Sequence, residues 1–306
     1  MEHGPLVLIL VPQVGGRLMG IQWHGHELSF INPDCQGRVQ DVSAIADVHA
    51  CKRRLGFLLW GGDKTWLAPQ TRWSDDVPFI DLDSGAYEIA IDDRKGQAVM
   101  TSPVCRETGV QIERTVTVGD EPGAWRVVHT LHNRAEQEVS WAPWDVAMID
   151  RPATVYLPTR RGSHFPQGLR TFDNEGVSAE VRDRVVRFVD GGAVISCHEA
   201  VKFKYGVDAE MGRVLAVIEV GDYGLVGLRK TVPAYPERQY AHGCVVEVFN
   251  AADYPYFELE LHGPVTTLAP GESFSLEETA TVFDLDRSPV DSADIRRCLG
   301  LEPSRL

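Results

Sequence analysis

The 306-residue sequence predicts an all-β fold, built as a large antiparallel β-sandwich. Three observations indicate this class. Short runs of β-branched and aromatic residues recur along the chain, turn-forming segments separate them, and helical periodicity is nearly absent before the C-terminal tail. Strands at a spacing of roughly eight to twelve residues, without helices between them, are typical of sandwiches and barrels.

Strands are expected wherever the chain alternates between polar and apolar residues or carries β-branched and aromatic runs of strand length. The expected strands are Tyr87–Ile91, Val110–Val118, Trp125–Leu131, Val185–Val189, Val214–Val220, Val245–Phe249 and Tyr256–Leu261. Segments rich in glycine and aspartate mark the turns between them. These turns are Asp92–Gln97, Gly119–Ala124, Asp190–Gly192 and Gly221–Gly224.

Two segments depart from this pattern of strands and turns. Arg160–Glu175 is the longest irregular segment, and a loop of that length in a compact β domain is usually functional or mobile, so we place it near the rim of the sandwich. At the end of the chain we expect one short helix, with Asp291 or Ser292 as its N-cap and Gly300 as its stop signal.

The composition excludes several classes of partner. A formal net charge of −14 and a pI near 5.1 argue against a nucleic-acid partner and against charge-driven binding to an anionic membrane. The apolar run Leu6–Val11 is too short for a signal sequence, and no window reaches the length of a membrane span.

The six cysteines are far apart and lack zinc-site spacing, which predicts a reduced cytoplasmic protein without metal or cofactor. Its oligomeric state, monomer or homodimer, stays open.

The stretch "LWGGDKTWLAPQTRW", Leu59–Trp73, is unusually dense in aromatic, charged and glycine residues. Sugars pack their C–H faces on aromatic rings, while their hydroxyl groups need donors and acceptors. We therefore interpret the stretch as one wall of a sugar-sized pocket, with Trp66, Trp73 and Trp144 as its platform. Polar contacts would come from Asp63, Lys64, Gln70 and Arg72. The alternative is that Trp66 and Trp73 belong to the core.

Three segments together resemble galactose-mutarotase-like (aldose 1-epimerase-like) proteins. They are "LVPQVGGRLMGIQWHGHELSFINP" (Leu10–Pro33), "LHNRAEQEVSWAPWDVAMI" (Leu131–Ile149) and "FELELHGPVTTLAPGESFSLEETATVF" (Phe257–Phe283). The sequence is most similar to a poorly characterised bacterial branch with "GG-x-x-x-W-x-AP" and "APW". The resemblance implies a large antiparallel β-supersandwich of galactose-mutarotase type, with a carbohydrate-sized cleft on its concave face. We expect this domain over residues 1–286, followed by a helical tail over residues 287–306.

The resemblance also implies a mechanism that uses an acid and a base on opposite sides of one sugar ring. Glu260 falls where the family has its catalytic glutamate, so it is the expected base. Glu258 lies two residues earlier in the same strand and faces the same side of the sheet, and Glu247 could flank that face. These carboxylates could raise one another's pKa or hold a hard cation, although no calcium-loop pattern is present. The alternative is that Glu258 and Glu260 both face solvent.

The acid is where the sequence departs from the family. The first family histidine is replaced by Asp63 within "GGDK", and the second falls at Trp144 within "APWDV". The candidates that remain for the acid are Asp63 and His242. Lys204, in "FKYGVD", is a further candidate for the cleft, although a lysine in solvent is the commoner outcome.

Three functions stay open at this point. The first is an aldose 1-epimerase-like protein that acts on a carbohydrate or a sugar-like ring by general acid–base chemistry. The second is a non-catalytic carbohydrate-binding protein that kept the cleft. The third is a repurposed cyclase or isomerase that acts on a non-sugar metabolite in the same cleft.

Overall fold

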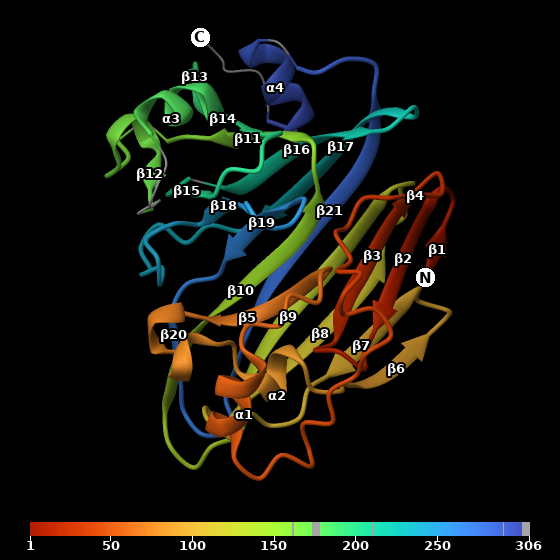
Figure 1. Ribbon diagram of the computed structural model, residues 1–306, viewed down its shortest axis with the longest axis vertical. Coiled ribbons are helices and arrows are strands. Elements are labelled where there is room, and N and C mark those ends of the chain that lie inside the picture. The colour runs from red at the N-terminus through yellow and green to blue at the C-terminus, as the bar shows by residue number, and fades with distance from the viewer. Residues whose placement is uncertain (161, 173–177, 210, 290, 302–306) are drawn as a thin grey trace.

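Two antiparallel β-sheets stacked face to face form the body of the protein in this computed structural model, which describes residues 1–160, 162–172, 178–209, 211–289 and 291–301 (Figure 1). Within the described residues, the first sheet has eleven strands and the second has ten. Nearly all of the larger apolar side chains between the sheets belong to one continuous core. The predicted all-β sandwich is confirmed.

The first sheet carries the site described below. Its strands run in the spatial order β1 (Glu2–His3), β2 (Leu6–Val11), β3 (Arg17–Trp23), β5 (Asp63–Ala68), β10 (Val139–Asp150), β19 (Tyr256–His262), β18 (Val246–Asn250), β15 (Phe203–Val207) and β12 (Arg170–Thr171). Two short strands join it from the side, β4 (His26–Glu27) on β3 and β20 (Thr266–Leu268) on β10.

The second sheet forms the opposite layer. Its spatial order is β13 (Val186–Val189), β14 (Gly192–Cys197), β11 (Ala153–Pro158), β16 (Gly212–Val220), β17 (Gly224–Val232), β21 (Ser273–Leu285), β9 (Ala124–Asn133), β8 (Val110–Val118), β7 (Gln97–Thr101) and β6 (Glu88–Asp92). The seven strands expected from the sequence all form, within three residues of the expected ends, and β8 has the bounds that were expected.

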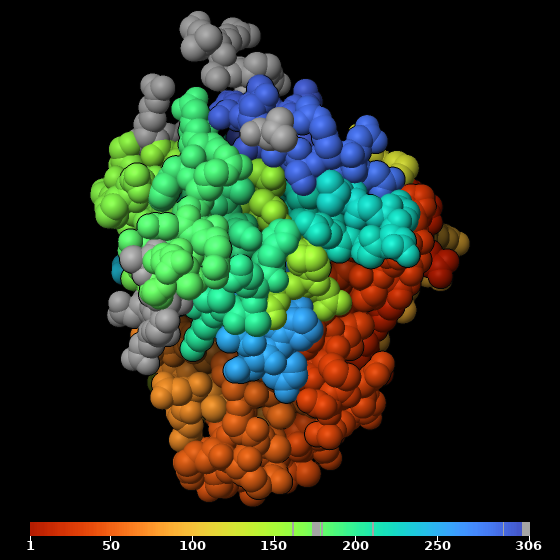
Figure 2. All heavy atoms as spheres, turned by 45° about the horizontal axis from the view of Figure 1, so that its top comes forward, coloured from red at the N-terminus to blue at the C-terminus, as the bar shows by residue number. Residues whose placement is uncertain are grey.

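The helix expected at the end of the chain is α4 (Ser292–Cys298). Asp291 is its N-cap and accepts a hydrogen bond from the backbone N–H of Asp294. Ile295 and Leu299 pack on the outer face of the second sheet, and the blue C-terminal segment lies next to green and cyan segments on the surface (Figure 2). The tail is thereby held against β11, β14 and β16.

Three further helices form where the sequence analysis expects none: α1 (Val48–Leu55), α2 (Ile80–Asp83) and α3 (Ala179–Val185). Each has eight residues or fewer, which is too short to display a helical period. In α1 and α3 the signal is a local cap: Asp47 accepts from the N–H of Ala50, and Ser178 accepts from the N–H of Val181. Among the described residues, no helix has the length and apolar character needed to cross a membrane.

The long segment from Arg160 to Glu175 is not wholly irregular. It contains a 3₁₀ turn at Pro166–Gly168 and the edge strand β12, while residues 161 and 173–175 lie outside the described residues. The Arg160 guanidinium donates to the Asp208 carboxylate at 3.1 Å. This contact ties the start of the segment to the end of β15.

Replacing Asp150 by asparagine is expected to stabilise the protein at pH 8 by about 1–2 kcal/mol, after allowance for partial solvent screening. Burial at the end of β10, with a smaller contribution from Glu27, raises the pKa of Asp150 to about 7. A carboxyl group whose pKa is higher in the folded than in the unfolded state loses stability as pH rises between those two values. The advantage of Asp150→Asn should therefore grow from about pH 4 to about pH 7. Urea unfolding of the variant and the parent protein across this pH range measures the difference in their free energies of unfolding. The same difference at both ends of the range would contradict a raised pKa for Asp150.

Candidate functional site

A cavity of about 420 Å³ lies on the face of the first sheet that points away from the second sheet. This volume is within the range of small-molecule sites. We call it the pocket and define it by its lining residues: Phe57, Leu59, Trp66, Gln70, Trp144, Lys202, Lys204, Phe249, Ala251, Ala252, Asp253, Tyr254, Tyr256, Glu258 and Glu260. Both aromatic rings and charged side chains line it.

Strand alternation explains which side chains reach the pocket. In β19, Glu258 and Glu260 point to the pocket face, whereas Phe257, Leu259 and Leu261 point into the core. The register of neighbouring strands then brings remote segments together, because Trp144 lies opposite Trp66 and Glu260 lies opposite Glu247. The expected convergence of Trp66, Trp144 and Glu260 on one surface is present.

Two neighbouring side chains hold one carboxylate oxygen of Glu260 in the pocket. Its Oε2 accepts hydrogen bonds from the indole N–H of Trp144 at 2.9 Å and from the Lys204 ammonium at 2.8 Å. Its Oε1 is buried and has no hydrogen-bond partner among the described residues. The same ammonium lies 2.7 Å from Oε2 of Glu247, so Lys204 bridges two carboxylates.

The pKa values of the two carboxylates that share Lys204 are shifted in opposite directions. Burial, to which Glu247 and Glu258 add, raises the pKa of Glu260 to about 8 against the opposing charge of Lys204. Burial acts in the same direction on Glu247, but Lys204 and His262 outweigh it and hold the pKa of Glu247 well below its usual range. The two glutamates together raise the pKa of Lys204, although burial opposes this. Such a separation is typical of an acid–base site, and a pKa near neutrality suits proton transfer.

A close approach of backbone and side chain supports this arrangement at Gly206. A Cβ atom at this position would lie 2.6 Å from the Cys244 Sγ and 3.1 Å from the Glu247 Cγ. Gly206 is the register partner of Glu247 on the adjacent strand. Glycine therefore leaves the space that the Glu247 side chain and Cys244 occupy.

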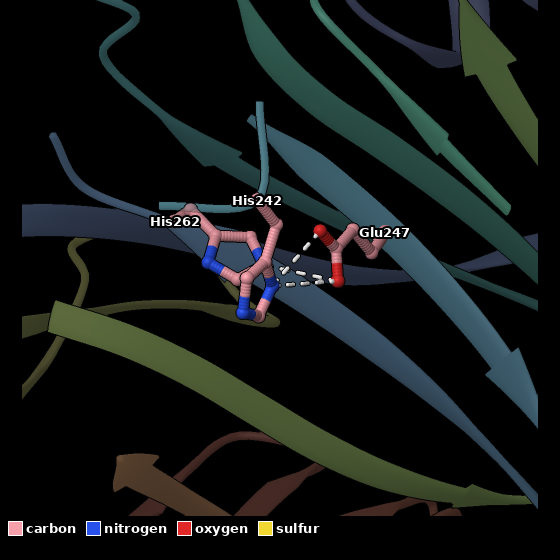
Figure 3. Close-up of side chains that lie close together, drawn as sticks. All are labelled: His242, Glu247 and His262. Atoms are coloured by element: carbon pink, nitrogen blue, oxygen red, sulfur yellow. Dashed lines mark hydrogen bonds and ion pairs between the residues drawn. The ribbon is translucent and has the colours of Figure 1, made fainter. Parts of the chain in front are cut away.

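Two histidines lie beside the pocket next to Glu247 (Figure 3). His242 was expected from the sequence, and its Nδ1 lies 3.2 Å from Oε1 of Glu247. His262 was not expected, and its Nε2 lies 3.3 Å from Oε2 of Glu247. The signal for His262 was available, because it continues the alternation of Glu258 and Glu260 by two residues. Burial lowers the pKa of His262.

Lys64 and Glu258 form a buried pair on the same face of the sheet. The Lys64 ammonium lies 3.4 Å from Oε1 of Glu258 and 4.5 Å from the centre of the Trp66 ring. Burial lowers the pKa of Lys64. Glu258 lines the pocket and Lys64 stands behind it, so the expected contact of Lys64 with a ligand is indirect.

Two other expected contacts lie outside the pocket. Arg72 donates to the backbone carbonyl of Ser140 and stacks over the Trp141 ring at 3.9 Å. Trp73 is buried and donates its indole N–H to the carbonyl of Leu67 at 2.7 Å. Arg72 and Trp73 hold the loop after β5 in place, because their polar atoms are already bound to backbone.

Asp63 also lies outside the pocket, because alternate residues of β5 point to opposite faces of the sheet. Its carboxylate points between the sheets and binds Arg114 and Lys230. Burial opposes its ionisation, but these two cations hold the pKa of Asp63 well below its usual range. Asp63 is therefore out of reach as an acid for a ligand in the pocket.

Asp63 belongs to a buried group of charges between the two sheets, which we call the inner cluster. Its members are Asp63, Arg114, His129, Asp145, Lys230 and Glu278. Lys230 lies 2.7 Å from Asp63, 2.6 Å from Asp145 and 3.2 Å from Glu278. Burial lowers the pKa of His129 to about 4 and raises that of Asp145 well above its usual range.

Comparison with known proteins shows the fold. No protein-family model and no curated protein matches the sequence. A galactose mutarotase-like protein from Lactobacillus casei ATCC 334 superimposes with a TM-score of 0.56 at 8% identity, over 92% of this chain and 99% of that chain. A galactose mutarotase-like protein from Clostridium acetobutylicum gives 0.56 at 10% identity, over 93% and 94%.

A third solved structure, provisionally named an aldose 1-epimerase, comes from Escherichia coli K12. It gives a TM-score of 0.56 at 12% identity, over 93% of this chain and 98% of that chain. At these identities the likeness concerns the fold. The chain has the galactose-mutarotase-like fold, as the sequence resemblance implies.

Proposed function

We propose that the pocket binds a carbohydrate, or a ring of similar size and polarity, and that Glu260 transfers a proton to or from it. One observation carries the proposal. Glu260 lines a pocket of monosaccharide size together with Trp66 and Trp144 and keeps one carboxylate oxygen without a hydrogen-bond partner among the described residues. A ligand hydroxyl group would supply that partner.

The neighbours of Glu260 suit chemistry at a sugar ring. Trp66 and Trp144 meet edge to face at 5.2 Å and line the pocket with exposed fractions of only 6% and 2%, so most of the apolar surface on which C–H groups can pack comes from Phe57, which is 39% exposed. The Lys204 ammonium adds a fixed positive charge that would stabilise a developing alkoxide. Glu258, on the same face, offers the second carboxyl group that an acid–base pair needs. The likeness in fold to proteins named for mutarotase and aldose 1-epimerase activity makes anomerisation the first reaction to test.

A second function competes with catalysis. The lining residues that the structure describes include no histidine, although the family resemblance implies one as the acid. This absence favours a carbohydrate-binding protein that does not turn its ligand over. The two functions share the pocket and differ only in proton transfer.

Polarimetry of freshly dissolved α-hexoses and α-pentoses, combined with sugar-dependent thermal shifts, tests the proposal. We expect one of these sugars to stabilise the protein, by about 2.7 kcal/mol at a hundred times its dissociation constant, and its mutarotation to be accelerated. Stabilisation without acceleration would select the binding function. Neither effect with any sugar would contradict the proposal.

A pair of phenylalanine variants locates the binding. Phe57 lines the pocket and packs edge to face on Trp66, whereas Phe188 lies on the edge strand β13, and their exposed fractions are 39% and 41%. Phe57→Ala should weaken sugar binding about tenfold, because one aromatic contact is lost, and Phe188→Ala should not. Equal affinities in the two variants would place the sugar elsewhere.

A further inference from the structure

We propose that His242, Glu247 and His262 form a binding site for a divalent transition-metal ion of the zinc class. The proposed sugar chemistry does not use this trio, which lies beside the pocket rather than in its lining. The three side chains come from the loop before β18, from β18 and from β19, and they point toward one another (Figure 3).

The distances between the three side chains fit a shared ion. His242 Nδ1 lies 3.2 Å and 3.3 Å from the two oxygens of Glu247, and His262 Nε2 lies 3.3 Å from Oε2. One ligating atom from each residue lies within 4.8 Å of the other two. In a tetrahedral zinc site with bonds of about 2.1 Å, ligand atoms are about 3.4 Å apart. Small side-chain movements would therefore place all three around one ion.

His262 supplies a second, independent observation. Its ring is fully buried, Nδ1 has no hydrogen-bond partner among the described residues, and Nε2 lies 3.3 Å from Oε2 of Glu247 without hydrogen-bond geometry. Buried polar atoms in native proteins are almost always satisfied. A metal ion between Nε2 and Glu247 would give this nitrogen the well-aligned partner that the carboxylate alone does not provide.

The chemistry of the ligands defines the class of ion. Two imidazole nitrogens and one carboxylate oxygen suit zinc and its first-row neighbours, whereas calcium and magnesium prefer oxygen ligands alone. Three protein ligands leave a fourth position for water. The side chain of His242 is 13% exposed, so an ion can reach the site from that side.

Lys204 defines how the ion would be held. Its ammonium lies 2.7 Å from Oε2 of Glu247 and supplies positive charge where the ion would bind. It also lies 2.8 Å from Glu260 and can keep that partner when Glu247 binds a metal. Lys204 and the ion should therefore compete for Glu247.

Titration with ZnCl₂ against a chromophoric chelator, and with CoCl₂ followed by visible d–d absorption, tests the site. The background should carry Cys35→Ser and Cys298→Ser, because these two thiols are partly exposed and could bind zinc by themselves. We expect one ion per chain and a cobalt spectrum without thiolate charge-transfer bands. The partly exposed His242 tolerates replacement better than His262, so His242→Gln is the first variant and His262→Gln the second. Each should weaken binding at least about 100-fold, while His132→Gln, outside the trio, should not.

Lys204→Met, unlike the two histidine variants, is expected to bind zinc more tightly than the parent protein. Removing the competing ammonium leaves Glu247 without that cation, so zinc should bind about tenfold more tightly or better. Failure of the parent protein to bind zinc, parental zinc affinity in both histidine variants, or no gain in Lys204→Met would each overturn the proposal. None of these results depends on whether a sugar binds, so failure here leaves the proposed function untouched.

Discussion

Replacing Lys230 by methionine is expected to lower the free energy of unfolding by about 3–5 kcal/mol, because three buried carboxylates lose the cation that they share. Methionine keeps the length and approximate volume of the side chain, so the loss reports charge rather than a cavity. A change of this size is a large part of the stability of an ordinary domain. Urea unfolding at pH 7 measures it.

Two further variants test whether the expected loss of stability comes from the buried charge of Lys230. Lys95→Met removes an exposed lysine that is paired with Asp92 on the surface, and it should change stability by less than about 0.5 kcal/mol. Adding Asp145→Asn to Lys230→Met removes one of the stranded carboxylates and should recover part of the loss. A loss below about 1 kcal/mol in Lys230→Met alone would show that the inner cluster does not depend on this cation.

Replacing Glu260 by glutamine is expected to slow sugar mutarotation by about 10²- to 10⁴-fold, if the parent protein accelerates it. The amide keeps the shape of the carboxyl group and can still accept from Trp144 and Lys204, but it cannot gain or release the proton at working pH. Sugar affinity should fall much less than the rate, by about tenfold at most, since Trp66 and Trp144 remain in place.

The controls for Glu260→Gln separate chemistry from folding. Glu277→Gln, on the exposed face of β21, should retain the parental rate. The melting temperature of Glu260→Gln should be compared with that of the parent protein, because the carboxylate is buried against Lys204. A folded Glu260→Gln protein with the parental rate would remove Glu260 from the mechanism.

The sequence predicts the layers of this fold well, because alternation and turn chemistry are local properties. It also predicts that Trp66, Trp144 and Glu260 meet, through the family resemblance and the order of the strands. Short helices such as α1 escape the prediction because their caps, rather than a period, define them. The loop residues that close the pocket, such as Phe57 and Tyr254, escape it because nothing local fixes where a loop folds back.

The face on which a side chain lies is the harder problem. Asp63 and Lys64 are neighbours in one strand, and a shift of one residue exchanges their positions between core and pocket. All six residues of β5 are buried, so the strand does not alternate between buried and exposed positions. The sequence of β5 therefore does not show whether Asp63 or Lys64 faces the pocket. His262 is the converse case, since the alternation that selects Glu260 in β19 also selects His262.

The space left by Gly206 has a consequence for recognising related chains. Because a side chain there would collide with Cys244 and Glu247, the arrangement requires a Lys-x-Gly triplet in one strand. The two neighbouring strands contribute two further patterns. One is a glutamate five residues after a histidine, as in His242 and Glu247, and the other is the Glu-x-His triplet of Glu260 and His262. A distantly related sequence that carries these three patterns in this order, whatever its overall identity, would have the same two glutamates bridged by one lysine.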